Sequence, residues 1–164
     1  MKFIKVFKNS LWIMFLSGLV VFDRCAIKED EPEFDKELLL QLVNSYRASG
    51  CNCGSEGYFV PTVSLEWNDI LERAAHDHCV DMFTNKFFSH TGSDGSDVGT
   101  RLNRRGYKWK TCGENISSGR QTEKSVIDGW MKSPGHCRNI MNPTFKEIGA
   151  SRKDSYWTLV LGTR

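Results

Sequence analysis

Two histidines, far apart in the chain, each lie in a short polar motif that contains glycine and follows an apolar helical segment. His90 lies in FFSHTG, His136 lies in SPGHCRNIM, and Glu114 lies between them in GENI. Functional side chains concentrate in loops of this kind, which a rigid framework positions. A fold that brings the two imidazoles and the carboxylate together creates an open metal site or an acid–base pair.

Residues 1–24 have the layout of an export signal or an N-terminal anchor. Three lysines precede an apolar run from Leu11 to Phe22, which is too short for an ordinary membrane-spanning helix. Cys25 stands where a bacterial lipoprotein carries its lipid and is the candidate lipidation site, although Asp23 and Arg24 depart from the usual lipobox. Residues 25–33 are acidic and contain proline, which predicts a solvated tether. We therefore expect an exported protein that is secreted, periplasmic or anchored to the envelope, with membrane attachment at the N-terminus only.

The charge of the chain does not indicate a nucleic-acid partner. Residues 1–24 hold four basic residues and one acidic residue, so the rest of the chain has a formal net charge of −1 in place of +2 for the whole. A nucleic-acid surface would need a basic excess in the domain itself. Arg101, Arg104 and Arg105 cluster locally, and we expect them on a solvated helix face. The domain is expected to be a monomer.

Hydrophobic periodicity predicts helices alternating with a few strands. Helices are expected over residues 35–48, 68–86, 97–105 and 122–132, and strands over 112–117, 147–152 and 156–161. The Ser133-Pro134-Gly135 sequence is expected to end the last helix, which leaves His136 in a loop. The pattern predicts an α+β protein with a three-layer α-β-α sandwich. His78 falls on the apolar face of its helix and is expected to be a buried structural residue, whereas His76 is expected in solvent.

Four motifs, FFSHTGSDGS, GENI, GWMKSPGHCRNIMNP and EIG, occur in this order. Their order and spacing resemble the CAP superfamily of cysteine-rich secretory, antigen 5 and pathogenesis-related proteins, and in particular its short bacterial branch. The resemblance covers residues 34–162. It implies a single domain over residues 34–164, in which a small, mostly antiparallel sheet is flanked by helices. It also places His90 and His136 at the family's cleft histidines and Glu114 at the glutamate of its GEN motif.

One position departs from the pattern of the larger eukaryotic members. Those proteins carry a second glutamate three residues after the tryptophan that matches Trp130, whereas this chain has Ser133 there. The loss of one carboxylate weakens a metal site. His90 and His136 remain the candidate ligands of Zn²⁺ or another divalent cation. Asn115 is expected either to satisfy backbone groups near the cleft or to contact a ligand, and Ser133 is the remaining candidate cleft residue.

The cysteines of an exported chain are expected to form disulfides. The candidates are Cys51, Cys53, Cys79, Cys112 and Cys137, and an odd number of cysteines cannot all pair internally. A bridge between Cys51 and Cys53 would be strained, because the two are only two residues apart. We predict that Cys137 bonds either Cys51 or Cys53.

Three hypotheses about function follow. The first is a binding module whose cleft meets an extracytoplasmic ligand: a peptide, a lipid or a cell-wall component. The second is a metal-assisted hydrolase in which Glu114 is the candidate catalytic base; two histidines are one protein ligand short of the common catalytic zinc set. The third is a structural envelope protein, in which His90, Glu114 and His136 merely brace loops.

Overall fold

The computed structural model describes residues 34–164. The predicted export segment 1–24, the tether 25–33 and the candidate lipidation site Cys25 therefore lie outside the described residues. The elements follow in the order α1 (Lys36–Ser49), β1 (Cys51–Asn52), η1 (Gly54–Glu56), β2 (Tyr58–Phe59), β3 (Glu66–Trp67), α2 (Asp69–Asn85), α3 (Val98–Arg104), β4 (Thr111–Ser118), α4 (Glu123–Lys132), α5 (Pro134–Met141), β5 (Glu147–Lys153) and β6 (Tyr156–Thr163).

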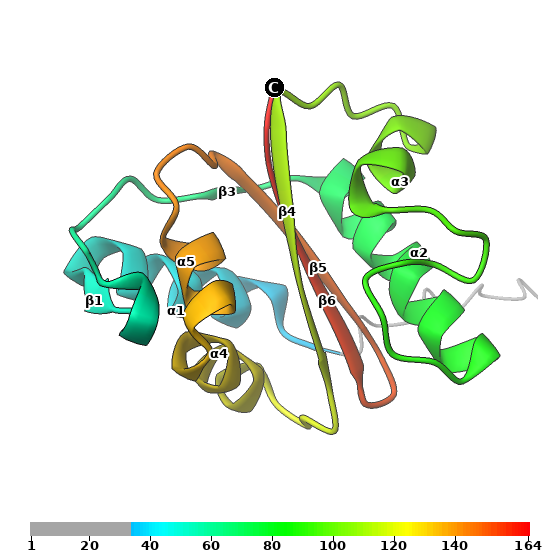
Figure 1. Cartoon of the computed structure of the whole chain (residues 1–164), viewed down its shortest axis with the longest axis horizontal. Coiled ribbons are helices and arrows are strands. Elements are labelled where there is room, and N and C mark those ends of the chain that lie inside the picture. The colour runs from blue at the N-terminus through cyan, green and yellow to red at the C-terminus, as the bar shows by residue number, and fades with distance from the viewer. Residues whose placement is uncertain (1–33) are drawn as a thin grey trace, which may run out of the picture.

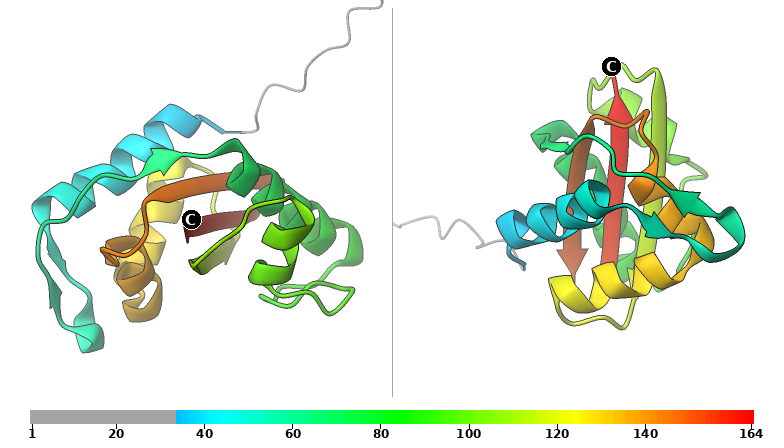
Figure 2. Two further views of the ribbon diagram at one scale, coloured as in Figure 1. Left: turned by 90° about the horizontal axis from the view of Figure 1, so that it is seen from above. Right: turned by 90° about the vertical axis from the view of Figure 1, so that its left-hand side faces the viewer.

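The central sheet has the strand order β3-β5-β6-β4. Strand β3 pairs with β5 in parallel, and the other two pairings are antiparallel. Helices α2 and α3 cover one face of this sheet, while α1, α4 and α5 cover the other (Figures 1 and 2). This arrangement confirms the predicted α+β fold, in which a small and mostly antiparallel sheet is flanked by helices.

Side chains of strand β6 contribute to two hydrophobic cores, one on each face of the sheet, because successive side chains of a strand point to opposite faces. Trp157, Leu159 and Leu161 join the core under α1, α4 and α5. Val160 joins the smaller core under α2 and α3. The neighbouring strand β5 allows α2 to approach closely, since a Cβ atom on Gly149 would lie 2.2 Å from the backbone nitrogen of Glu72.

Most helix boundaries follow from capping residues. The Asp35 side chain accepts a hydrogen bond from the backbone of Leu38 and caps α1, and Asn68 and Asp97 cap α2 and α3 in the same way. Such caps satisfy backbone N–H groups that have no partner within the helix. These three starts agree with the sequence prediction.

The prediction that Ser133-Pro134-Gly135 leads into a loop was wrong. Helix α4 ends at Lys132, Ser133 is the N-cap of the next helix, and Pro134 begins α5. Proline suits the first position of a helix because its φ angle is already helical and its missing N–H group would have no partner there. His136 therefore projects from the first turn of a helix instead of a loop.

A buried arginine holds the far end of α5. Arg47 of α1 is 0% exposed, and its guanidinium donates hydrogen bonds to the carbonyl groups of Ile140 and Asn142 at 2.6 and 2.9 Å. It also donates to the carbonyl of Val63 at 2.8 Å. Burial lowers the pKa of Arg47 to about 10. The last carbonyls of a helix need such outside donors, so Arg47 fixes α5 against α1.

Candidate functional site

Strand β4 places two neighbouring polar side chains on opposite faces of the sheet. Glu114 lies opposite Val160, whose side chain belongs to the α2–α3 core, and Asn115 lies opposite Leu159, whose side chain belongs to the other core. Both residues are buried, with 7% and 0% of their surface exposed. Consecutive residues of one strand thus face the two segments that carry the histidines.

Glu114 fixes His90. Nδ1 of His90 donates a hydrogen bond to Oε1 of Glu114 over 2.8 Å. An ionised carboxylate can only accept hydrogen bonds, so the proton of a neutral His90 ring lies on Nδ1. The lone pair is then on Nε2. The His90 side chain is 57% exposed, which leaves it accessible to a ligand.

Arg101 balances the charge of the buried Glu114 carboxylate. Its guanidinium lies 2.6 Å from Oε2 of Glu114, and both side chains are almost completely buried. The same guanidinium donates to the carbonyl groups of Ser96 and His90. The expectation of a solvated arginine face was therefore wrong for Arg101. A buried carboxylate needs a cationic partner, but the burial of Glu114 is visible only in the folded protein, so no signal in the sequence pointed to this role of Arg101.

The side chain of His78 holds the backbone of the segment before His90 through a hydrogen bond. It is fully buried, as predicted, and its Nε2 lies 2.8 Å from the carbonyl oxygen of Ser89. Since a carbonyl only accepts, Nε2 carries the proton. The pKa of His78 is lowered, chiefly by burial, so the ring is neutral at pH 7. His76 is exposed, as predicted, and lies away from this network with its Nδ1 3.3 Å from Ser151 Oγ.

Asn115 holds the backbone of His136. Its side-chain amide donates to the carbonyl of His136 at 3.1 Å, and its oxygen accepts from Asn139 at 3.0 Å. Asn139 also donates to the carbonyl of Glu114 at 3.3 Å. These bonds join the first and second turns of α5 to β4. They correspond to the first of the two expected roles of Asn115, the satisfaction of backbone groups. Asn139 was not identified from the sequence as a partner of Asn115.

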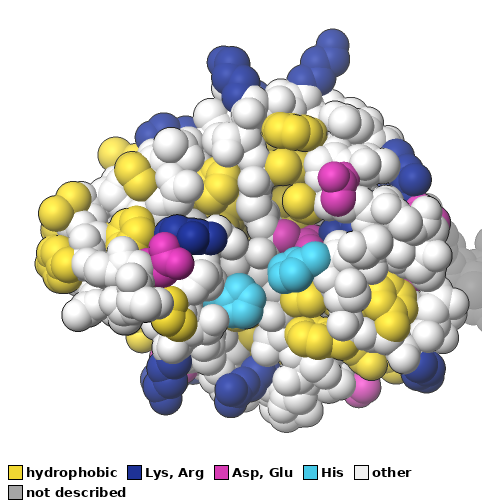
Figure 3. All heavy atoms as spheres, viewed as in Figure 1, with side chains coloured by type: hydrophobic (Ala, Val, Ile, Leu, Met, Phe, Trp, Pro, Cys, Tyr) yellow, Lys and Arg dark blue, Asp and Glu magenta, His cyan; other side chains and the backbone are white. Residues whose placement is uncertain are grey.

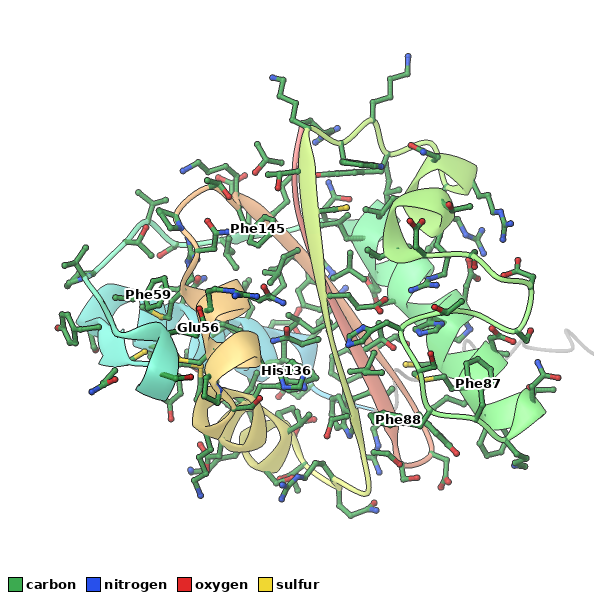
Figure 4. The ribbon with its side chains drawn as sticks, in the orientation of Figure 1. Glu56, Phe59, Phe87, Phe88, His136 and Phe145 are labelled. Carbon is green, nitrogen blue, oxygen red and sulfur yellow. A yellow bond between two sulfur atoms is a disulfide. The ribbon has the colours of Figure 1, made fainter. Side chains whose placement is uncertain are left out.

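His136 lies close enough to His90 for the two rings to influence each other. It is half-buried, and its pKa is lowered first by burial and second by the charge of His90. Figure 3 shows two histidine side chains together on one face of the molecule, and Figure 4 shows His136 projecting from α5 beside β4. His90, Glu114 and His136 are called the histidine site below.

Ser133 is the remaining candidate residue. Ser133 is half-buried between α4 and α5, three residues before His136, and its side chain makes no capping hydrogen bond. Throughout residues 34–164, His90 and His136 do not gather with a third histidine, cysteine or acidic ligand within 4.8 Å. The two imidazoles are thus the donor set that the histidine site offers to a metal ion.

A disulfide joins Cys53 to Cys137, the residue after His136, and so confirms one of the two predicted pairings. Cys51, Cys79 and Cys112 are free thiols. Arg138 of α5 also forms an ion pair with Glu56 of η1. The disulfide and the ion pair hold the histidine-bearing turn of α5 against the β1–β2 hairpin.

The chain matches the model of the Cysteine-rich secretory protein family, CAP, over residues 40–160. It is 33% identical over 96 residues to the uncharacterised protein YkwD of Bacillus subtilis, a match that covers 57% of this chain and 37% of that protein. The chain therefore spans little more than a third of this relative's length.

Solved structures share the fold. An extracellular protein of Bacillus anthracis that contains an SCP domain superimposes with a TM-score of 0.70 at 25% identity, over 78% of this chain and 40% of that one. An outer surface protein of Borrelia burgdorferi superimposes with a TM-score of 0.62 at 20% identity, over 80% of this chain and 96% of that one. None of the helices within residues 34–164 is long and apolar enough to cross a membrane.

Proposed function

Because the chain belongs to the cysteine-rich secretory protein family, we propose that it is an exported binding module whose histidine site takes up a divalent metal ion such as zinc. The hydrogen bond between Glu114 and His90 carries this proposal. A carboxylate that binds one ring nitrogen of a histidine orients the other nitrogen toward a metal and raises its basicity. The half-exposed His90 ring has this arrangement before any metal is bound.

His136 supplies the second donor. Only a neutral imidazole can bind a metal, and the lowered pKa of His136 keeps its ring neutral at pH 7. Two protein ligands leave coordination positions for groups of the bound molecule. A metal ion held there would act as a Lewis acid toward a carboxylate or phosphate oxygen of that molecule. The partners proposed for the site are a peptide, a lipid or a cell-wall component outside the cytoplasm.

The geometry gives less support to a metal-assisted hydrolase. A hydrolase of this kind needs a carboxylate that is free to take a proton from water. Oε1 of Glu114 already accepts from His90, and Oε2 is paired with Arg101. Ser133 stands where the larger eukaryotic members of the family carry a second glutamate. Glu114 is thus better suited to orient His90 than to act as a base.

Calorimetric titration of the protein with zinc tests the proposal. We expect weak binding at pH 7.5 and its loss in both His90→Ala and His136→Ala. His76→Ala is the matched control, because His76 is an exposed histidine outside the site. Zinc affinity that stays unchanged in both site variants would leave a metal-free binding surface as the better account.

Export is the second part of the proposal. The basic and apolar N-terminal segment supports it, together with the extracellular and outer-surface proteins that share the fold. Cell fractionation of the full chain, compared with a chain that lacks residues 1–24, tests it. Equal amounts of both chains in the cytoplasm would contradict export.

A further inference from the structure

Three sulfur atoms meet where the β1–β2 hairpin contacts α5. Cys53 and Cys137 form the disulfide. The free sulfur of Cys51 lies 3.6 Å from the sulfur of Cys137 and 3.9 Å from that of Cys53. The sulfur atoms lie between the hairpin and α5 (Figure 4). A free thiol therefore touches both atoms of an existing bridge.

We propose that Cys51 and the Cys53–Cys137 bridge form a thiol–disulfide exchange site, in which Cys137 is bonded to the hairpin through either Cys53 or Cys51. The Cys51 thiol loses its proton, and the thiolate attacks the sulfur of Cys137. A bond forms between Cys51 and Cys137, the bond between Cys53 and Cys137 breaks, and Cys53 leaves as a thiolate that takes up a proton. The electron count balances, and no outside oxidant or reductant is needed.

Cys137 is slightly the nearer of the two sulfur atoms, at 3.6 Å against 3.9 Å. Since these distances are almost equal, the Cys51 sulfur lies beside the bond, and its side chain must rotate into line with the bond before it attacks Cys137. Attack at Cys53 would join residues that are separated only by Asn52, and disulfides tolerate few backbone geometries. It would also release α5 from the hairpin. Exchange through Cys137 keeps the turn that carries His136 cross-linked in both states.

Access to the three sulfur atoms is unequal. Cys51 is half-buried, whereas Cys53 and Cys137 are 2% and 0% exposed. Exchange thus moves the free thiol between a partly accessible and a buried position. Burial raises the pKa of the Cys51 thiol, and the thiolate is the attacking species. The exchange should therefore be slow at neutral pH and faster in more alkaline solution.

The other free thiols do not share this arrangement. Cys79 is buried and donates hydrogen bonds to the carbonyl of Ser151 and the hydroxyl of Thr158. Cys112 is half-buried on β4 at the edge of the other core. A Cys112→Ser variant, which removes a half-buried thiol away from the bridge, is therefore the matched control and should leave the labelling of Cys51 and Cys53 unchanged.

Trapping of the free thiol in the full-length protein tests the exchange. The protein is incubated at alkaline pH, quenched in acid, unfolded and alkylated, and the tryptic peptide of residues 48–73 is fragmented. This peptide contains both Cys51 and Cys53, so fragmentation at Asn52 shows which of them carries the label. We expect label on both cysteines, with the share on Cys53 growing faster as the pH rises. Label confined to Cys51 at every pH and time would overturn the proposal.

A Cys53→Ser variant gives an independent test through its count of free thiols. If Cys51 takes over the bridge, the variant has one free thiol fewer than the wild-type protein and still yields a disulfide to the peptide of residues 133–138. If Cys51 cannot do so, both Cys51 and Cys137 are free, the count is one higher, and the proposal fails. The trapping experiment on the wild-type protein still decides the question if this variant does not fold. Neither experiment depends on metal binding at the histidine site.

Discussion

Nδ1 of His90 and Oε1 of Glu114 are joined by a hydrogen bond of 2.8 Å that sets the tautomer of the histidine. The second oxygen of the same carboxylate is paired with Arg101 at 2.6 Å. A single buried acid thus links the exposed ring to the buried cation of α3. We infer that Glu114 positions His90 and that Arg101 makes the buried carboxylate tolerable.

Glu114→Gln is expected to weaken both the fold and the metal site. The variant leaves Arg101 buried without its counter-charge, and breaking a buried ion pair costs about 3–5 kcal/mol. Removal of the carboxylate that orients a metal-binding histidine lowers metal affinity about 10- to 100-fold. Urea unfolding measures the first effect and zinc titration the second. Unchanged zinc affinity in a folded variant would show that Glu114 does not orient His90 toward metal.

Acid should destabilise the protein through its two histidines with lowered pKa values. Burial is the main cause of the lowered pKa of both His78 and His136. The unfolded chain therefore binds protons more readily than the folded one. These residues cost no stability above about pH 6.5, the ordinary histidine pKa. Stability is lost as the pH falls from there through their lower pKa values in the folded protein. Urea unfolding between pH 7.5 and 5 measures the slope. His78→Gln should show a smaller slope than the wild-type protein, and an equal slope would contradict this assignment.

Arg47 should be among the most sensitive positions far from the histidine site. Arg47→Met removes the donors that serve four carbonyl groups, of which the bonds to Ile140 and Phe145 are buried. Each buried polar group without a partner costs about 1–3 kcal/mol, so we expect a loss of about 2 kcal/mol or more in the free energy of unfolding. Arg138→Met is the control, since its pair with Glu56 lies at the surface and should contribute no more than about 1 kcal/mol.

Two glycines should respond oppositely to alanine. Gly149→Ala places a Cβ atom 2.2 Å from the backbone of α2 and should destabilise the fold by about 1–3 kcal/mol or more through overpacking. Gly135→Ala meets nothing within 4 Å and lies in the first turn of helix α5, where alanine is favoured by up to about 1 kcal/mol. Thermal unfolding of both variants provides the measurement. A lower melting temperature for Gly135→Ala would show that α5 needs flexibility at this position.

Local signals in the sequence predicted most of the fold. Asp35, Asn68 and Asp97 mark helix starts because their side chains satisfy backbone groups within a few residues. The same kind of local reasoning failed at Pro134, because proline ends one helix and begins another with equal ease. The backbone geometry around Ser133 decides between these outcomes, and the apolar pattern alone does not reveal it.

The motifs drew attention to His90, Glu114 and His136 but not to the residues that support them. Arg101 and Asn139 were not singled out. Arg101 reaches Glu114 only when α3 has packed against the sheet in the folded protein. Asn139 reaches Asn115 only after α5 has packed on β4. Such partners depend on tertiary contacts that residue type and spacing do not encode. The choice of Cys53 over Cys51 for Cys137 was left open for the same reason.

The most direct measurement of the central claim is the nitrogen NMR spectrum of the histidine rings at pH 7.5, with and without zinc. We predict that His90 carries its proton on Nδ1 in the free protein, and that zinc shifts Nε2 of His90 together with one ring nitrogen of His136, while the signals of His76 stay in place. A proton on Nε2 of His90, or zinc that leaves both site histidines unchanged, would contradict the account.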